Sequence, residues 1–296
     1  MVKSFDPSQL RKLYIPPPNS HKGQNGKLMI IGGSKLFHGA SLWALKVASR
    51  IVDMVFYSSV PENNKLVVET KKEFRDGIVV PRDKVENYIK EADCILIGPG
   101  LPRVDGEQKG DDDTKELTES LLKKYPKKKW VIDGGSLQTI DPQFIPRNAI
   151  LTPHVKEFET LFGNTLHATR DTKEDRQRVT SLVSRVAIQH KCTILLKGPT
   201  DVVCGMDEST RPPTLALRRV KGGNAGMTKG GTGDVLAGLA AALYCKNDDP
   251  FLVASCSSYV NKKAGENLFK KVGYYFNASD LADEIPPTMK ELIPAI

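Results

Sequence analysis

Short apolar runs alternate with amphipathic segments along the chain. The runs are four or five residues long and rich in Val, Ile and Leu, which is typical of strands buried on both faces. They predict strands at 27–31, 54–58, 94–97, 130–133 and 193–196, a short strand ending at Leu151, and hairpin-like strands at 201–205 and 214–220. Helical periodicity predicts helices at about 6–13, 40–52, 82–91, 114–124, 152–163 and 172–190. The chain after residue 234 is predicted to be helical, with a helix cap at Asn277.

This order of elements predicts an α/β fold of three layers, in which helices cover both faces of a mostly parallel central sheet. No repeat, linker or low-complexity segment divides the chain, so residues 1–296 are predicted to form a single domain. Ligands bind such sheets at the carboxyl ends of the strands. We therefore expect one site where the turns converge, after Ile31, Ile97, Ile132, Leu151 and Leu196.

Composition excludes several classes of protein. With 40% hydrophobic and 26% charged residues, the chain has the balance of a soluble globular protein. It has no apolar run of about 18 residues and no apolar signal core near Met1, so neither membrane insertion nor export is expected, and a cytoplasmic location is predicted. The cysteines are scattered without a CxxC pair, which predicts reduced, mostly buried thiols and no zinc site. They are Cys94, Cys192, Cys204, Cys245 and Cys256.

A net charge of +8 admits nucleic acid as a partner but fits an anionic small molecule equally well. The basic cluster at 123–129 is predicted to be solvated surface at a helix end, so no nucleic-acid partner is predicted. The acidic segment at 105–113 lacks the spacing of a calcium-binding loop and is predicted to be a solvated loop.

The chemistry is expected at a glycine-rich stretch, Asn224–Asp234, which runs directly into the small-residue segment Val235–Leu243. This boundary predicts a helix N-terminus wrapped in glycine, where unpaired backbone amides and the positive end of the helix dipole point at one spot. Phosphate is the natural occupant of such a spot. We expect the amides of Gly231, Thr232 and Gly233 to hold a transferring phosphoryl group.

Asp234 lies in the first turn of the predicted helix and has two interpretations. A carboxylate there can simply stabilise the helix start. Alternatively, on a Gly-Thr-Gly platform it is displayed rather than buried, and it accepts the proton of an attacking hydroxyl. Phosphoryl transfer depends mainly on positioning and charge neutralisation, so a base of ordinary pKa can serve.

Two common phosphate motifs are absent. Lys229 follows Thr228 and precedes a glycine, which breaks the GxxxxGK[ST] order of the P-loop. The segment Gly98–Arg103 lacks the third glycine of the dinucleotide fingerprint. The chain is therefore predicted to be neither a Walker-type ATPase nor a Rossmann dehydrogenase.

Seven short motifs, in order along nearly the whole chain, resemble those of the ribokinase-like superfamily, whose GxGD motif carries a catalytic aspartate. More narrowly, they resemble the ADP- or ATP-dependent NAD(P)H-hydrate dehydratases. The motifs are His21-Lys22-Gly23 with Gly26, Gly32-Gly33-Ser34, Gly39-Ala40, Gly98-Pro99-Gly100-Leu101, Thr152-Pro153-His154 with Glu157-Phe158, Lys197-Gly198-Pro199-Thr200-Asp201, and Gly230-Gly231-Thr232-Gly233-Asp234.

The resemblance implies a repair reaction, in which the hydrated nicotinamide of NADHX or NADPHX is phosphorylated from ADP or ATP and phosphate is then eliminated. It implies that Asp234 activates the hydroxyl, beside an anion hole made by Gly231, Thr232 and Gly233. The implied nucleotide-binding residues are Lys197, Gly198, Pro199, Thr200, Asp201, Asn224, Ala225, Gly226, Met227, Thr228, Lys229, Gly230, Gly231, Thr232 and Gly233. The implied substrate-binding residues are Ala40, Gly100, His154, Val155, Lys156, Glu157, Phe158, Glu159, Thr160 and Asp234.

Two site residues keep alternative interpretations. Lys197, at a strand end, either neutralises phosphate or is an ordinary surface lysine. Glu157 either ligates Mg²⁺ through water or stabilises the start of its own helix. The implied cofactors are ADP or ATP with Mg²⁺.

The chain departs from the family pattern at three places. Asp133-Gly134-Gly135-Ser136 lacks the second acid of an Asp-Ala-Asp-type segment, Pro102 replaces a glycine, and the acidic segment at 105–113 is inserted. These changes bear on the nicotinamide side of the expected site. No epimerase domain is recognised, so the R form of the hydrate is expected to need a separate epimerase or spontaneous epimerisation. A homo-oligomer is compatible with the sequence.

Two other functions remain as alternatives. One is a small-molecule kinase of the same superfamily, of the hydroxymethylpyrimidine or hydroxyethylthiazole type, with the same Asp234 and anion hole. The other is a non-enzymatic nucleotide-sensing or nucleic-acid-binding protein on a kinase fold. The product distinguishes the first from a dehydratase, because a kinase releases a phosphorylated alcohol.

Overall fold

The computed structural model describes residues 3–69, 76–103, 108–163, 172–207 and 210–293, and it contains a ten-stranded sheet. The strand order is β1-β10-β9-β8-β7-β6-β5-β2-β3-β4. The strands are β1 (Lys3–Ser4), β2 (Lys27–Ile31), β3 (Met54–Ser58), β4 (Ile78–Val79), β5 (Cys94–Ile97), β6 (Lys129–Ile132), β7 (Ile150–Leu151), β8 (Thr193–Leu196), β9 (Asp201–Asp207) and β10 (Thr214–Val220).

Ten α-helices of the described residues accompany the sheet: α1 (His38–Ala48), α2 (Pro61–Glu69), α3 (Val85–Glu91), α4 (Thr114–Lys124), α5 (Gly134–Thr139), α6 (Val155–Phe162), α7 (Lys173–His190), α8 (Thr232–Lys246), α9 (Pro250–Val272) and α10 (Ala278–Leu292). Short 3₁₀ helices occur at Pro7–Lys12, Arg82–Lys84, Pro142–Phe144 and Ala225–Thr228.

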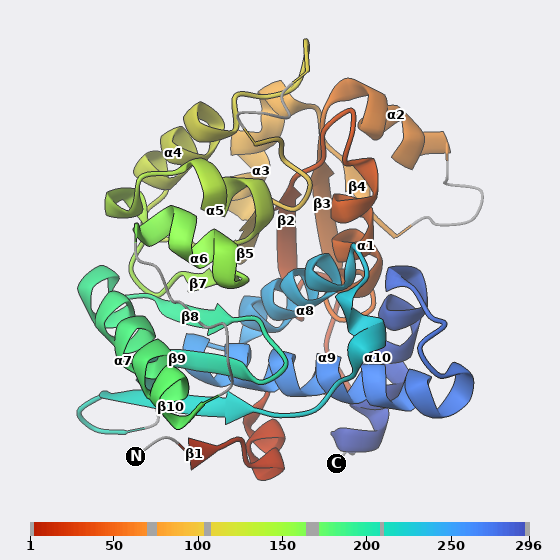
Figure 1. The fold of residues 1–296 in the computed structure, drawn as a ribbon. Helices are drawn as coiled ribbons and strands as arrows, with labels where there is room; N and C mark the ends of the chain where they lie inside the picture. The colour runs from red at the N-terminus through yellow and green to blue at the C-terminus, as the bar shows by residue number, and fades with distance from the viewer. Residues whose placement is uncertain (1–2, 70–75, 104–107, 164–171, 208–209, 294–296) are drawn as a thin grey trace.

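The sheet from β8 through β4 is parallel, as the alternation of strands and helices predicts. β9 pairs antiparallel with both β8 and β10, so the expected hairpin is confirmed, and it extends the sheet on one side. Parallel pairing brings the carboxyl ends of β2, β5, β6, β7 and β8 to one edge (Figure 1).

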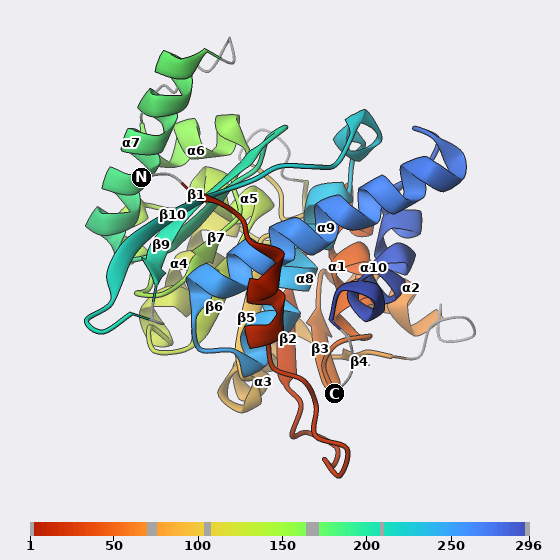
Figure 2. The ribbon, with the colours of Figure 1, turned by 90° about the horizontal axis from the view of Figure 1, so that it is seen from below.

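Two hydrophobic clusters cover the two faces of the sheet, because alternate residues of each strand point to opposite faces. In β2, Leu28 and Ile30 belong to the cluster of α1, α8, α9 and α10, whereas Met29 and Ile31 belong to the cluster of α3–α7. All four side chains are fully buried. The two layers of helices are visible in two orientations (Figures 1 and 2), so the three-layer prediction is confirmed.

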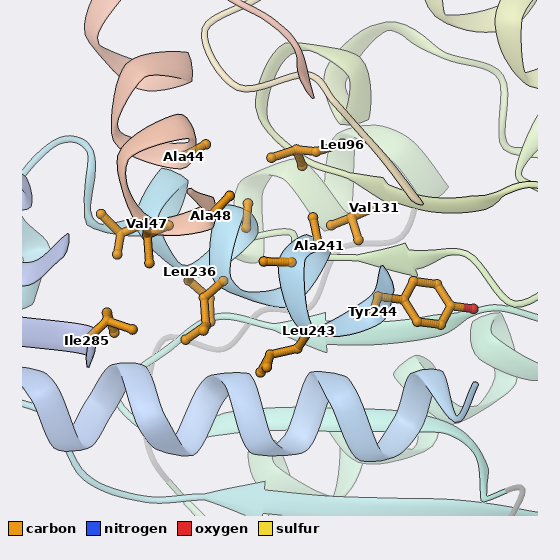
Figure 3. Close-up of a cluster of buried hydrophobic side chains, with 14 of the residues drawn as sticks. Ala44, Val47, Ala48, Leu96, Val131, Leu236, Ala241, Leu243, Tyr244 and Ile285 are labelled. Atoms are coloured by element: carbon orange, nitrogen blue, oxygen red, sulfur yellow. The ribbon is translucent and has the colours of Figure 1, made fainter. Parts of the chain in front are cut away.

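The small residues of α8 let this helix lie in the middle of its layer. Leu236, Ala241 and Leu243 pack among residues of α1, α10 and the sheet (Figure 3). A Cβ on Gly238 would lie 2.7 Å from the backbone of Ala44, so α1 and α8 are in close contact. Because α8 is packed on several sides, the position of its N-terminus is set by the core.

Several predicted boundaries differ from the structure. The helix expected at 40–52 is α1 at His38–Ala48, that at 6–13 is a 3₁₀ helix, and that at 82–91 divides into a 3₁₀ turn and α3. α2, α5 and the short strands β1 and β4 were not predicted. α5 begins with two glycines, which are poor helix formers, and burial of Leu137 on the sheet outweighs this local preference.

The acidic segment is not simply a solvated loop, as the sequence suggested. Residues 104–107 lie outside the described residues, but Asp111 accepts a hydrogen bond from the Lys35 amide at 2.9 Å, and Asp112 pairs with Arg82 at 2.7 Å. Asp113 caps α4. Asp111 and Asp112 therefore fasten their segment to the chain just beyond β2 and β4.

The lysines of the basic cluster at 123–129 are largely engaged within the chain. Lys124 pairs with Glu86, Lys128 donates to two backbone carbonyls, and Lys129 pairs with Asp248. All five cysteines are buried free thiols, as expected. No helix in the described ranges has the length and apolarity needed to cross a membrane.

Candidate active site

A cleft of about 670 Å³ opens beside the N-terminus of α8. Its walls come from the turn after β8, the glycine-rich stretch before α8, and the middle of α9. Its lining residues are His154, Lys197, Gly198, Pro199, Asp201, Gly222, Gly223, Asn224, Ala225, Met227, Thr228, Thr232, Gly233, Leu236, Asn261 and Lys262. This volume is in the range of small-molecule sites.

The cleft brings together two segments that were expected to bind a nucleotide, the turn at 197–201 and the stretch at 224–233. Most of the predicted nucleotide residues line it. Five described residues of that set lie outside the lining: Thr200, Gly226, Lys229, Gly230 and Gly231. Lys229 points elsewhere, because its ammonium donates to the carbonyls of Tyr274 and Phe276.

Other members of the nucleotide set hold the loops in shape. The Asn224 side chain accepts from the Gly226 amide at 2.9 Å and donates to the Gly265 carbonyl at 2.8 Å. The buried Asp201 accepts from the Gly198 amide at 2.9 Å and from Ser258 Oγ at 2.6 Å. Their side chains therefore build the walls of the cleft.

The helix N-terminus has the expected form. Gly231 occupies the cap position of α8 in a left-handed conformation with φ of 92°, and Asp234 lies in the first turn. Thr232 Oγ1 lies 2.6 Å from the Met227 carbonyl oxygen and 2.9 Å from that of Lys229, so the hydroxyl closes the glycine loop. The Thr232 amide also has a long contact of 3.4 Å to the Lys229 carbonyl.

Gly231 tolerates no side chain at this position. A Cβ there would lie 2.4 Å from the ring of Trp43, in a backbone conformation that L-residues avoid. We expect Gly231→Ala to lower the free energy of unfolding by about 2 kcal/mol or more, as measured by denaturant titration. Gly230→Ala is the matched control, because a Cβ on Gly230 meets no described atom within 4 Å. Equal stability of the two variants would contradict this geometry.

Lys197 is not a surface lysine. Its side chain is 18% exposed, and its ammonium lies 2.9 Å from Asp133 Oδ1 and 3.7 Å from Glu157 Oε2. A Cβ on Gly233 would lie 3.3 Å from the same Nζ, which places the ammonium at the mouth of α8. Burial opposes this charge, but the Asp133 and Glu157 carboxylates outweigh it and raise the pKa of Lys197. The ammonium is therefore permanent at neutral pH.

Asp234 is half-buried, and it follows the cleft-lining Gly233 without itself lining the cleft, so it is less displayed than the sequence suggested. Burial and the Asp133 charge, opposed by Lys197, raise the pKa of Asp234 to about 7. A base of ordinary pKa would have been sufficient for phosphoryl transfer, but the pKa of Asp234 is raised, because the fold buries this carboxyl near Asp133. A carboxyl with this pKa takes up and releases a proton near neutral pH.

Glu157 and His154 form a capping box at the start of α6. The His154 amide donates to Glu157 Oε2 at 2.9 Å, and the Glu157 amide donates to His154 Nδ1 at 3.2 Å. Partial burial and Lys197 lower the pKa of His154, so its ring is neutral at pH 7. Burial raises the pKa of Glu157. Glu157 therefore stabilises the start of its own helix, which is one of the two interpretations considered from the sequence.

On the expected substrate side, Ala40 and Gly100 are adjacent, since a Cβ on Gly100 would lie 3.0 Å from Ala40 Cβ. The residues of this set at the start of α6 and within it have side chains that point in different directions. Phe158 is fully buried and packs on Phe162, so its side chain belongs to the core and does not line a pocket. The Lys156 and Thr160 side chains are exposed, Val155 and Glu159 are partly exposed, and only His154 of this segment reaches the cleft.

Two departures from the family pattern lie next to each other. A Cβ on Gly135 would lie 2.1 Å from the Leu101 carbonyl oxygen, directly before Pro102. An acid cannot occupy position 135 while this backbone keeps its path. The close approach of Leu101 therefore gives a packing reason for glycine at position 135.

Sequence reasoning missed three residues of the site. Asp133, noted only within a departing motif, is buried at the end of β6 and pairs with Lys197. Asn261 and Lys262 enter from the middle of α9, where Asn261 Oδ1 is buried without a hydrogen-bond partner. Asp133 could have been found from its place after an apolar strand, but a mid-helix Asn-Lys pair carries no local signal.

Comparison with known proteins gives a consistent result. A family model described as NAD(P)H-hydrate dehydratase matches residues 28–287. The chain is 33% identical over 301 residues to the ADP-dependent (S)-NAD(P)H-hydrate dehydratase of Cenarchaeum symbiosum, covering 98% of this chain and 94% of that protein. It is 36% identical over 291 residues to the bifunctional NAD(P)H-hydrate repair enzyme of Methanocaldococcus jannaschii, covering 95% of this chain and 51% of that protein. The chain thus spans about half the length of this bifunctional relative.

A solved structure has the same fold. The ADP/ATP-dependent NAD(P)H-hydrate dehydratase of Bacillus subtilis, co-crystallised with ATP and Mg²⁺, aligns with a TM-score of 0.75 at 22% identity, covering 98% of this chain and 99% of that one. The ribokinase-like, mostly parallel α/β architecture is therefore confirmed.

Proposed function

The chain belongs to the NAD(P)H-hydrate dehydratase family, and we propose that it converts the S form of NADHX or NADPHX back to NADH or NADPH with ADP or ATP as phosphoryl donor. The observation that carries this proposal is the convergence of a permanent cation, Lys197, with the glycine-capped N-terminus of α8 at a cleft. Asp234 lies in the first turn of this helix, directly after the cleft-lining Gly233. Two positive features beside a carboxyl of pKa about 7 suit transfer of a phosphoryl group to a hydroxyl.

In the proposed mechanism, the hydroxyl oxygen of the hydrate attacks the terminal phosphorus of the nucleotide and its proton passes to the Asp234 carboxylate. The new oxygen–phosphorus bond replaces the bond from that phosphorus to the bridging oxygen, which leaves with AMP or ADP. The carbon–oxygen bond of the nicotinamide ring then breaks, phosphate departs, and loss of a proton from the adjacent carbon restores the ring double bond. The amides of Gly231, Thr232 and Gly233 and the Lys197 ammonium stabilise the charge on the phosphoryl oxygens.

Magnesium fits this site as an ion held mainly by nucleotide phosphates. Among the described residues no group of three or more His, Cys, Asp or Glu side chains is placed to hold a metal ion. Glu157 already accepts from the His154 amide, and Gln138 Nε2 lies 3.3 Å from its other oxygen, so Glu157 would hold the ion through a water molecule. The ion would supply charge neutralisation on the phosphates.

The decisive assay incubates the purified protein with S-NADHX, Mg²⁺ and either ADP or ATP, and follows the absorbance of the dihydropyridine ring. We expect absorbance to rise with stoichiometric release of phosphate. A phosphorylated alcohol that accumulates without NADH would instead identify a small-molecule kinase. Salt-dependent binding to DNA or RNA without nucleotide turnover would support the non-enzymatic alternative.

The pH dependence of this reaction follows from Asp234. The base form is required, and its pKa is about 7, so kcat/KM is expected to fall about tenfold per pH unit below that value and to be flat above it. Stopped-assay measurements from pH 5.5 to about 8.5 test this prediction. A profile that is flat down to pH 5.5 would exclude a base with a raised pKa.

We further propose that residues 1–296 act as one catalytic unit in the cytoplasm. The R form of the hydrate would reach it through a separate epimerase or by spontaneous epimerisation. Size-exclusion chromatography with light scattering tests whether the unit is a homo-oligomer. Adding an NAD(P)HX epimerase should let the protein consume a mixed R and S substrate completely.

A further inference from the structure

Asp133 lies closer to the Lys197 ammonium than Glu157 does, at 2.9 Å against 3.7 Å. We propose that Asp133 is a positioning residue, which holds this ammonium over the N-terminus of α8 so that cation and helix amides meet the same phosphoryl group. The inference rests on the proposed function. It adds to that function a residue outside the motifs that suggested it.

The ammonium occupies an electrostatically unfavourable place. The N-terminus of a helix is the positive end of its dipole, so a lysine charge beside it is repelled unless carboxylates compensate. Lys197 Nζ lies near Gly233, in the first turn of α8, and is mostly buried. Without Asp133 we expect the flexible lysine stem to move the charge away from the helix. A cation held at this position has a function only when an anion binds both to the ammonium and to the helix amides.

Asp133 is itself held firmly. It follows β6 directly and is 2% exposed. Its amide donates to the Ile97 carbonyl of β5 at 3.1 Å, and its Oδ1 accepts from Thr152 Oγ1, just after β7, at 2.7 Å. The same Oδ1 accepts from Lys197. Because the carboxylate is anchored by the ends of three adjacent strands, it can fix a long side chain at one point.

Glu157 does not provide the same anchor. It is farther from the ammonium, and Oε2, the oxygen that faces Lys197, already accepts from the His154 amide in the capping box. Glu157 adds negative charge near Lys197, whereas Asp133 makes the hydrogen bond that determines where the ammonium lies.

A second buried lysine–aspartate pair in the same cleft provides a contrast. Lys262 lies 3.2 Å from Asp201 and donates to the Gly198 carbonyl at 3.0 Å, with the Pro199 and Gly222 carbonyls at 3.3 and 3.4 Å. This ammonium is surrounded by protein oxygens and ties two loops together. In the part of the chain that the structure describes, the Lys197 ammonium pairs with the carboxylates of Asp133 and Glu157. Lys197 also lines the cleft.

A double-mutant cycle tests the inference. We expect Asp133→Asn, which keeps the size of the side chain, to lower kcat about 100-fold while the KM for nucleotide changes less than about threefold. We expect Lys197→Met to lower kcat about 1000-fold. If Asp133 acts through Lys197, the double variant should be no slower than Lys197→Met within about threefold. Losses that multiply to about 10⁵-fold would overturn the inference.

Asp201→Asn is the matched control for removing a buried aspartate from a lysine pair. It should raise the KM for nucleotide with little change in kcat. This is the opposite of the result expected for Asp133→Asn, which lowers kcat with little change in KM. Should Asp133→Asn fail to fold, Thr152→Val removes only the hydrogen bond that orients Asp133. That variant should lower kcat about fivefold in the wild-type background and have no effect beside Lys197→Met.

The outcomes separate the inference from the proposed function. If the wild-type protein is active and Asp133→Asn has the same kcat, the inference is overturned but the proposed function is not. A higher nucleotide KM without a loss of kcat would assign Asp133 a purely structural role. Wild-type protein that leaves S-NADHX unchanged with both nucleotides would overturn the proposed function and the inference together.

Discussion

Replacing Asp234 with asparagine is expected to lower turnover by about 10⁴-fold while nucleotide affinity stays within about threefold. The amide keeps the shape of the carboxylate but cannot accept the hydroxyl proton. The first turn of α8, Lys197 and the walls of the cleft remain in place, so the nucleotide still binds. Single-turnover absorbance measurements and calorimetric titration with a non-hydrolysable nucleotide separate the two effects. Near-normal turnover in Asp234→Asn would remove Asp234 from its role as the base.

The same variant should be more stable than the wild type at neutral pH, which a merely misfolded variant would not be. The pKa of Asp234 is about 7 in the folded protein, against an ordinary value of 3.8 for this side chain, so the folded state favours the neutral carboxyl. The protonated Asp234 carboxyl contributes its full stabilisation of the folded state below about pH 4. This contribution is lost as the pH rises towards 7. Asparagine removes that cost, which is up to about 4 kcal/mol at about 1.4 kcal/mol per pKa unit. Denaturant titrations at pH 5 and about pH 8 should show the gain growing with pH.

Removing the cation is expected to have the second largest effect. Lys197→Met should lower kcat about 1000-fold, because it deletes the charge that acts with the α8 amides on the phosphoryl oxygens. It also leaves Asp133 and Glu157 buried without their cation, so a loss of stability of about 3 kcal/mol is expected in thermal or denaturant unfolding. Turnover should therefore be measured at a temperature where the variant is fully folded.

Lys229→Met is the control for Lys197→Met. Lys229 is the other lysine of the sequence-predicted nucleotide set, and its ammonium is bound to the carbonyls of Tyr274 and Phe276. We expect kcat to change less than about threefold in Lys229→Met, although stability falls. If Lys229→Met lost as much turnover as Lys197→Met, the position of Lys197 in the cleft would not explain its catalytic effect.

Local patterns were sufficient for much of the fold. The strands at 27–31, 54–58, 94–97 and 193–196 and the helix at 114–124 have the predicted bounds, because each is a short apolar run or a capped amphipathic segment with clear ends. The capping box at Asn277 is confirmed for the same reason. α2 and α5 escaped prediction, since tertiary burial of one or two side chains outweighs weak local preferences.

The candidate site was likewise predictable only in part. The glycine-rich stretch and Asp234 were identifiable because a helix N-terminus after several glycines has a local signature. The directions of long polar side chains were not, since they depend on which strand ends become neighbours. Lys197 points into the site, Lys229 points away from it, and Phe158 is part of the core, although all three were assigned to the site by resemblance.

By itself the sequence determined the alternation of strands and helices, the edge of the sheet where a site forms, and the helix whose N-terminus would receive phosphate. These features depend on residue periodicity and on glycine near one point of the chain. Only the tertiary structure decided that Asp133, 64 positions before Lys197, holds the ammonium in the site, and that Asp234 titrates near pH 7. Both results require groups distant in sequence to be buried together, where desolvation and mutual charge outweigh the intrinsic properties of each residue.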